Sequence, residues 1–181
     1  MGLPTGYESP KKESKYLNKF EQGSTKFQVL AEDPENAFIW GWQIWHDHKP
    51  IRQMTMKDMP TGDIGFDGNE SEPEFFWSMV IWNITLNKLQ ILNVTKRQIQ
   101  KQIESFIDSD WGNICNMCLE VKREGQQLET RYTVIPTPLK KVPSEIMQEF
   151  ELLDIDLTLL FDGKDPFKKE GDTIDPDSVP F

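Results

Sequence analysis

The chain has 181 residues and a formal net charge of −10. This length suits one domain with extensions, whose core needs no disulfide or metal. No apolar run approaches the roughly 18 residues of a membrane helix, and the first residues lack the apolar segment of a signal peptide. The only two cysteines, Cys115 and Cys118, are typical of a reducing compartment, so we expect a soluble cytoplasmic protein.

The negative charge is unevenly distributed. Residues 143–181 contain eleven acidic residues and three lysines, a net charge of −8, which leaves −2 for residues 1–142. Within the first part, residues 83–103 carry four basic residues and no acidic one. This asymmetry indicates either an acidic tail that competes with nucleic acid for a basic surface or a tail that only aids solubility.

The first half of the chain predicts an arm, two strands and a loop. Residues 1–14 are rich in Pro, Gly, Lys and Glu and are expected to form a flexible arm. Residues 26–32 and 38–45 are short, aromatic and β-branched, and the breaker DPEN separates them, so they predict strands. Residues 46–73 predict a loop of 28 residues, a length that itself suggests a function.

Two hairpins are expected in the second half. Residues 74–83 and 88–94 are apolar runs joined by a short turn, and they predict the first hairpin. Residues 115–124 and 129–136 predict the second hairpin around the turn GQQL. Between the hairpins, the chain predicts a helix.

Residues 95–110 predict this helix, with Thr95 as its cap. Four apolar residues recur at helical spacing, namely Ile99, Ile103, Phe106 and Ile107. Three or so strands, a helix and two strands match a five-stranded OB-fold barrel with one helix between its third and fourth strands, formed here by residues 15–142. The outer face and loops of OB-folds bind oligonucleotides. An α+β sandwich has the same element order and stays open as an alternative.

Residues 143–161 predict an accessory helix or strand, and residues 162–181 predict a flexible acidic tail. Asp154 and Asp156 are paired carboxylates, but they alternate with leucine and isoleucine as in a half-buried strand rather than a nuclease site. The sequence contains no phosphate-binding glycine loop with lysine, no HExxH and no Ser, His and Asp at recognisable spacing. We therefore expect a protein that is not an enzyme.

Six segments occur in one order between residues 15 and 138. They are KYLNKFEQGSTKFQVL, GWQIW followed by KPIR, FFWSMVIWN, LQILNVTKRQIQKQI, DWG and GQQLETRYTVIPTP. In these segments the chain resembles the single-stranded DNA-binding proteins of tailed bacteriophages, an OB-fold replication family. The resemblance implies a protein that coats and protects single strands in DNA replication or recombination, in the cytoplasm of a bacterial host during phage infection.

The final residues DPDSVPF resemble the acidic tip of bacterial single-stranded DNA-binding proteins, which docks partner enzymes. The matching positions are Asp175, Asp177, Val179, Pro180 and Phe181. Pro176 and Ser178 interrupt the run of aspartates. The resemblance implies that the tip recruits a polymerase, a primase-helicase or a nuclease, and self-association stays open.

Binding of single strands without sequence preference needs aromatic faces for bases and cations for phosphates. The predicted strands contain more aromatic residues than a small barrel interior holds. They are Trp40, Trp42, Trp45, Phe75, Phe76, Trp77 and Trp82. Trp45 and Trp82 share their strand faces with Gln43 and Ser78, so they are the preferred stacking residues. Trp40 and Phe76 complete the predicted aromatic set.

Five basic residues are candidates for contacts with phosphates. Lys88, Lys122 and Arg131 alternate with apolar neighbours and should lie outside the barrel, while Lys49 and Arg52 open the long loop beside Trp45. The predicted DNA-binding residues are Trp40, Trp45, Lys49, Arg52, Phe76, Trp82, Lys88, Lys122 and Arg131.

A zinc site is the rival interpretation. His46, His48, Cys115 and Cys118 are all the histidines and cysteines in the chain, and two of each make a tetrahedral zinc set. The HxH spacing is tighter than in structural sites, so we expect no metal cofactor. The alternative functions are a zinc-stabilised OB-like adaptor that binds protein and an RNA-binding OB module, since no residue marks a contact with a 2′-hydroxyl.

Overall fold

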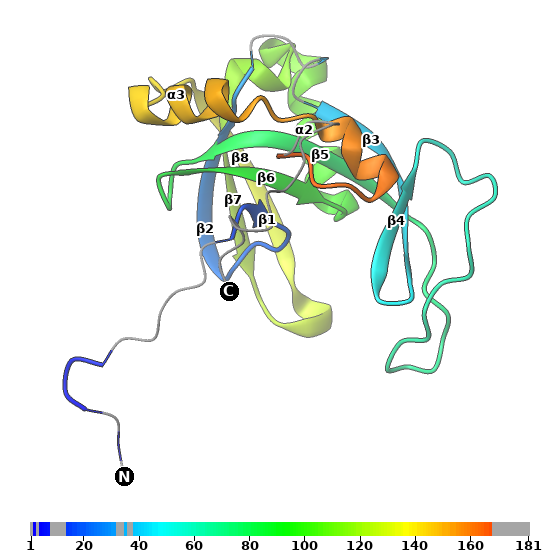
Figure 1. Ribbon diagram of the computed structural model, residues 1–181. Helices are drawn as coiled ribbons and strands as arrows, with labels where there is room; N and C mark the ends of the chain where they lie inside the picture. The colour runs from blue at the N-terminus through cyan, green and yellow to red at the C-terminus, as the bar shows by residue number, and fades with distance from the viewer. Residues whose placement is uncertain (1, 3, 8–13, 32–34, 36–37, 168–181) are drawn as a thin grey trace, which may run out of the picture.

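The computed structural model describes residues 2, 4–7, 14–31, 35 and 38–167 (Figure 1). These residues are mainly β, with eight strands and two α-helices. The strands are β1 (Tyr16–Leu17), β2 (Gly23–Val29), β3 (Phe38–His46), β4 (Lys49–Gln53), β5 (Glu74–Asn83), β6 (Lys88–Val94), β7 (Met117–Glu124) and β8 (Arg131–Pro138). The helices are α2 (Arg97–Phe106) and α3 (Ser144–Leu153). In this part of the chain, no helix is long and apolar enough to cross a membrane.

The eight strands form one open sheet with β5 near its centre. One edge of β5 pairs antiparallel with β6, and the other edge pairs first with β3 and then with β2. The sheet continues from β2 through β7 to β8, and β1 lies parallel to β6. Both predicted hairpins, β5–β6 and β7–β8, are therefore confirmed. The five-stranded barrel with one helix was not found in that form, because β1, β3 and β4 enlarge the sheet and α3 is a second helix.

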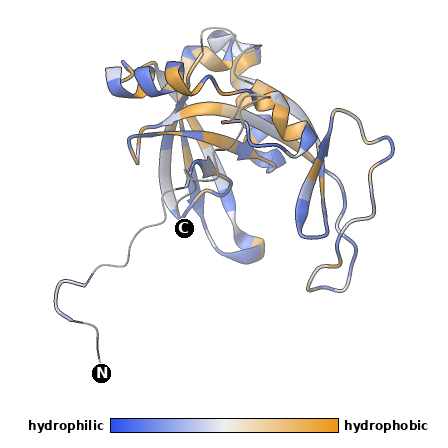
Figure 2. Cartoon of the chain, viewed as in Figure 1, coloured by the Kyte–Doolittle hydropathy of each residue, from blue (hydrophilic) through white to orange (hydrophobic). Residues whose placement is uncertain are grey.

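β5 is buried on both faces, which explains its nearly unbroken apolar run. On one face, Met79 and Ile81 belong to the main core, together with residues of β2, β7, β8 and α2. On the other face, Val80 and Trp82 belong to a second core with residues of α3 and of the 3-10 helix η4 (Leu157–Asp162). Figure 2 shows hydrophobic residues along β5 and in η4, and hydrophilic residues at the turn between β3 and β4.

The segment predicted as an accessory helix or strand is helical. It forms α3 and η4, which lie over the outer face of β5 and β6 (Figure 1). Ile146, Leu157 and Leu160 are buried there. These residues come from a region of net negative charge, yet their apolar side chains complete the second core. The alternation of Asp154 and Asp156 with apolar residues therefore marks a helix end and a cap, not a strand.

The predicted loop of residues 46–73 begins with a strand that the sequence reasoning missed. β3 and β4 form an antiparallel ribbon whose tight turn is Asp47–His48, both with positive φ, 50° and 63°. A two-residue turn of this kind normally uses Asn or Gly, since other side chains are strained there. The carboxylate of Asp63 accepts hydrogen bonds from both turn amides, each at 2.9 Å. This distant carboxylate stabilises a turn that has no local sequence signal.

The predicted helix is confirmed as α2, with Ile99 and Ile103 buried against the main core. Its predicted cap is wrong: Lys96 occupies the N-cap position, and no side chain caps the helix. The amide side chain of Gln102 joins α2 to β8, donating to the carbonyl of Tyr132 at 2.8 Å and accepting from the N–H of Val134 at 2.9 Å. The helix is therefore anchored to the sheet by its polar as well as its apolar residues.

Candidate nucleic-acid interface

Three aromatic residues form a surface cluster on β3 and β5, called here the aromatic platform: Trp40, Trp42 and Phe75. Because Trp40 pairs with Trp77 and Trp42 pairs with Phe75, these side chains lie on one face of the two strands. The Phe75 ring centroid is 5.3 Å from that of Trp42 and 6.2 Å from that of Trp40. Trp40 is 47% exposed, and the other two are half-buried. The platform therefore offers accessible ring surface that is held in place by neighbouring rings.

A cation lies beside the platform. The guanidinium of Arg97, at the start of α2, lies over the Phe75 ring at 5.4 Å from its centroid, within the range of a cation–π contact. A shallow groove of about 610 Å³ runs between β5 and α2 at the edge of the platform. It is lined by Trp42, Pro73, Glu74, Phe75, Thr95, Arg97 and Glu104. The same groove thus combines aromatic faces for bases with a guanidinium for phosphate.

The start of α2 is electropositive. The first turn contains no acidic residue and no capping side chain, so the positive end of the helix dipole is not compensated there. Lys96 and Arg97 add two cations at this position, and Lys101 is exposed one turn later. Arg97 also pairs with Glu104 at 3.5 Å, but both side chains are 45% exposed, so the pair is weak. Anions are favoured at such a helix end.

Gln100 holds the two halves of this site together. Its fully buried amide donates to the carbonyls of Phe75, at 3.1 Å, and Val94, at 2.9 Å. Its oxygen accepts a hydrogen bond of 2.7 Å from Arg97. One side chain therefore positions both the backbone of the platform and the guanidinium beside it.

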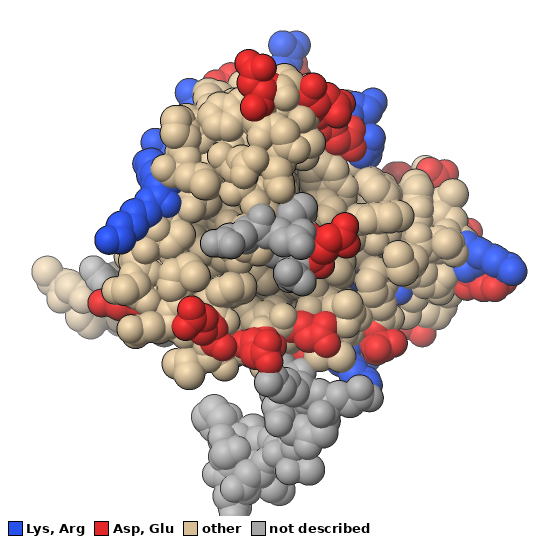
Figure 3. Space-filling model, turned by 90° about the horizontal axis from the view of Figure 1, so that it is seen from above, with Lys and Arg blue, Asp and Glu red and all other residues tan. Residues whose placement is uncertain are grey.

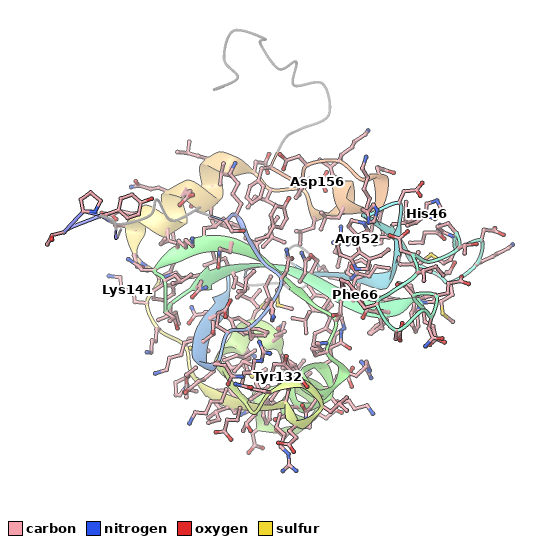
Figure 4. All side chains as sticks on the ribbon, turned by 90° about the horizontal axis from the view of Figure 1, so that it is seen from below. His46, Arg52, Phe66, Tyr132, Lys141 and Asp156 are labelled. Carbon is pink, nitrogen blue, oxygen red and sulfur yellow. The ribbon has the colours of Figure 1, made fainter. Side chains whose placement is uncertain are left out.

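The predicted residues Trp45 and Arg52 lie on the face of the β3–β4 ribbon opposite to Trp42, while Lys49 pairs with His46 at the end of the ribbon. All three line a second groove of about 780 Å³, between the ribbon and η4. Trp45 is 45% exposed, Lys49 is exposed and Arg52 is half-buried. Figure 4 shows Arg52 and His46 on the same ribbon, with Tyr132 and Lys141 at other edges of the molecule. Four of the predicted DNA-binding residues are therefore accessible, namely Trp40, Trp45, Lys49 and Arg52.

Two predicted stacking residues are buried and cannot offer a face to a base. Trp82 is only 7% exposed because α3 and η4 cover its face of β5. Its indole N–H donates to Asn87 at 3.1 Å. Phe76 is fully buried between Phe161 and Arg52. Its ring centroid lies 6.1 Å from the ring centroid of Phe161 and 5.5 Å from the guanidinium carbon of Arg52. The prediction failed because β5 is covered on both faces. The alternation of side chains along the strand therefore does not separate buried residues from exposed ones.

Three predicted phosphate contacts lie far from both grooves. Lys88 pairs with Asn83, eight residues along β5 from Phe75, or roughly 26 Å at the usual rise per strand residue. Lys122 and Arg131 belong to the β7–β8 hairpin, which pairs with β2 beyond that end of β5. Lys122 also lies 3.8 Å from the carboxylate of Glu120. These residues lie outside the two hydrophobic cores, but they do not join the aromatic residues.

The face formed by α3 and η4 is acidic. Figure 3, which views the molecule from above, shows acidic side chains gathered on this side. Seven acidic residues are exposed here, namely Glu145, Glu149, Glu151, Asp154, Asp156, Asp162 and Asp165. This face repels phosphate, except at its border with the second groove, where Arg52, Lys49 and Lys164 line the same groove as Asp165. The predicted tip, with Asp175, Asp177, Val179, Pro180 and Phe181, lies outside the described residues.

The four residues of the rival zinc set do not form one cluster. His46 contacts the carbonyl of Thr61 at 2.7 Å, and His48 lies 4.0 Å from the Asp63 carboxylate. Cys115 is buried in the 3-10 helix Ile114–Asn116, and Cys118 is buried near the start of β7. Among the residues that the structure describes, no three His, Cys, Asp or Glu side chains are close enough to hold a metal ion.

Sequence reasoning missed Phe75, Trp42 and Arg97 as members of a site. The two aromatic residues were part of the recognised cluster, but their position opposite α2 depends on tertiary structure. Arg97 was visible only as one base in a basic stretch. The one signal in the sequence is position: Thr95 directly follows a strand, and Arg97 lies two residues later. Both residues line the same groove.

Comparisons with protein-family models, with curated proteins and with solved structures find no match for this chain.

Proposed function

We propose that the protein binds single-stranded DNA, as the resemblance to the phage family implies, and coats single strands in replication or recombination. The observation that carries the proposal is the aromatic platform with Arg97 over Phe75. Stacking on aromatic residues accepts any base, and a cation beside the rings attracts the backbone. The electropositive start of α2 lies at the same groove and adds to this attraction.

We further propose that five of the eight strands correspond to an OB-type barrel. The path β6-β5-β2-β7-β8, with α2 between β6 and β7 in the chain, has the strand order and helix position expected of that fold. The β3–β4 ribbon is then an insertion between the first and second barrel strands. Loops at this point of OB-folds contact oligonucleotides, which supports a binding role for the ribbon.

The acidic C-terminal residues have a separate role in this proposal. The tip would recruit a polymerase, primase-helicase or nuclease, and the acidic charge would compete with DNA for the groove beside α2. Removal of residues 177–181 should leave the affinity for DNA equal or higher and abolish partner capture. A loss of affinity for DNA in this deletion would contradict the competition.

A fluorescence titration tests the proposed function. The tryptophan emission of the wild-type protein should be quenched by an oligo-dT strand at low salt, and more weakly by a DNA duplex of equal length. Trp40→Ala should weaken binding roughly 5- to 150-fold, the effect of losing one base stack of about 1–3 kcal/mol. Phe66→Ala is the matched control, because this exposed aromatic residue is not part of the platform, whereas Trp40 contacts the Phe75 ring.

Absence of quenching and of any mobility shift at low salt would refute single-stranded DNA binding. An equal or higher affinity for an RNA strand of the same sequence would favour the RNA-binding alternative. Binding that is unchanged in Trp40→Ala but lost in Phe66→Ala would move the site away from the platform.

A further inference from the structure

The groove on the other face of the β3–β4 ribbon differs in chemistry from the groove beside the platform. The platform groove has two aromatic residues in its lining, Trp42 and Phe75, and one cation, Arg97. The second groove, called here the polar groove, is lined mostly by residues with polar or charged side chains. The charged residues are Lys49, Arg52, Glu74, Lys164 and Asp165. The neutral polar residues include Asn18, Gln43 and Asn93, and Trp45 is the exposed aromatic residue.

Three side chains of the polar groove stand in a row across neighbouring strands. Gln43 of β3 pairs with Glu74 of β5 on one side and with Arg52 of β4 on the other. The Arg52 Nε donates to the Gln43 oxygen at 3.2 Å, and the Gln43 amide donates to Glu74 at 3.4 Å. With strands about 4.8 Å apart, the row holds a cation and a carboxylate separated by roughly 10 Å.

Arg52 suits a phosphate. Within the described residues, no carboxylate oxygen lies within 4.0 Å of its guanidinium, which is half-buried between Gln43 and the ring of Phe76. Lys49 is exposed at the mouth of the same groove. Since arginine side chains that are not paired with protein carboxylates bind phosphate through their planar donors, this end of the groove favours a backbone phosphate.

Glu74 suits the edge of a base. It is exposed and, among the described residues, its carboxylate accepts one long hydrogen bond, from Gln43, which leaves acceptor positions for a ligand. A carboxylate only accepts hydrogen bonds, and its partner on a base is an exocyclic amino group, as in the contact of Glu or Asp with the N4 amino group of cytosine. A carboxylate beside two cations would weaken simple phosphate binding, but it is favourable where one nucleotide spans the row.

We propose that the polar groove takes one nucleotide of the bound strand and selects a base with an exocyclic amino group. The phosphate lies at Arg52, the base stacks on Trp45, and the amino group donates to Glu74. This inference rests on the proposed binding of single-stranded DNA and gives that binding a base preference. The platform groove also borders Glu74, but neither Arg52 nor Gln43 lines it, so it lacks the complete row.

Cytosine and thymine test this, because the two pyrimidines have similar size and differ at position 4, where cytosine carries an amino group and thymine a carbonyl. The wild-type protein should bind oligo-dC at least about five-fold more tightly than oligo-dT of equal length, the lower end of one good base contact. Glu74→Gln should reduce this ratio towards one. Glu72→Gln, an exposed neighbour that does not line the groove, should keep the ratio.

Two further experiments distinguish the effect of the base contact from that of the phosphate contact and from that of a misfolded variant. Arg52→Met should weaken binding of both strands by the same factor and leave the ratio unchanged. A strand of N4,N4-dimethyl-deoxycytidine has no amino hydrogen, so the unmodified protein should bind it no better than oligo-dT. This arm needs no protein variant.

The outcomes distinguish the two proposals. If the wild-type protein binds neither oligo-dC nor oligo-dT, the proposed function fails and this inference fails with it. If it binds both strands with equal affinity, or if Glu74→Gln keeps the preference for cytosine, only the base selection is overturned.

Discussion

The guanidinium of Arg97 lies over the ring of Phe75, 5.4 Å from the ring centroid, and joins the start of α2 to the aromatic platform. The two residues are 22 positions apart in the chain and belong to different elements. Their contact creates the combination of ring and cation on which the proposed binding of DNA depends.

Arg97→Gln should weaken binding of single-stranded DNA and reduce its salt dependence. Loss of one phosphate contact lowers the slope of log K against log salt by about 0.7 for a single strand. Titrations at three or more salt concentrations measure the slope. Lys122→Gln is the control, because Lys122 lies in the distant β7–β8 hairpin, and its slope should match the wild type. Equal slopes in all three proteins would exclude Arg97 from the interface.

Gln100→Leu should lower both stability and affinity for DNA. The buried amide satisfies two backbone carbonyls, and leaving them unsatisfied costs about 1–3 kcal/mol in the free energy of unfolding. Its oxygen also holds Arg97, so the guanidinium loses its position. Urea denaturation and a DNA titration measure the two effects. An affinity equal to wild type in the folded variant would mean that Gln100 only stabilises the fold.

Trp82→Ala should destabilise the protein far more than Trp40→Ala. Trp82 is buried under α3 and η4, and truncation of such a residue costs about 3–5 kcal/mol, including the cavity that remains. Trp40 is 47% exposed, so its truncation should cost much less. Thermal melting of the two variants compares them directly. Similar melting temperatures would contradict the burial of Trp82.

The β3–β4 turn should loosen at acidic pH. Hydrogen bonds from the amides of His48 and Asp47 hold the pKa of the Asp63 carboxyl below its ordinary value. Because the folded pKa is the lower one, the stabilisation is complete above the unfolded pKa of about 4 and is lost as the pH falls through the folded pKa.

NMR titration of the Asp47 and His48 amide signals from pH 6 to pH 2 would follow this loss. Asp63→Asn keeps an acceptor oxygen but cannot titrate, so its turn signals should lack the transition. A transition of equal size in this variant would assign the pH dependence to another group.

The hairpins and the helix could be predicted from local pattern. The β5–β6 and β7–β8 hairpins are apolar runs around short turns, and Ile99 and Ile103 mark the buried stripe of α2. β4 could not be predicted in this way, because the carboxylate that stabilises its turn, Asp63, lies 15 residues beyond His48. A turn that depends on such a distant contact carries no signal in its own residues.

The candidate site was only partly visible in the sequence. The excess of aromatic residues was evident, and Trp40, Trp45, Lys49 and Arg52 are accessible on the ribbon. Which of the aromatic residues on β5 stay accessible depends on what covers each face.

The sequence by itself determined the mainly β class, the amphipathic helix and the surplus of aromatic residues, because these depend on periodicity and composition. Only the tertiary structure decided that Trp82 is core and that Phe75 stays half-exposed. α3 and η4 return from about 70 residues further along the chain to cover one face of β5, and the burial of apolar surface that drives this packing depends on area and not on sequence distance. The same packing leaves the other end of β5 beside Arg97, where ring and cation meet.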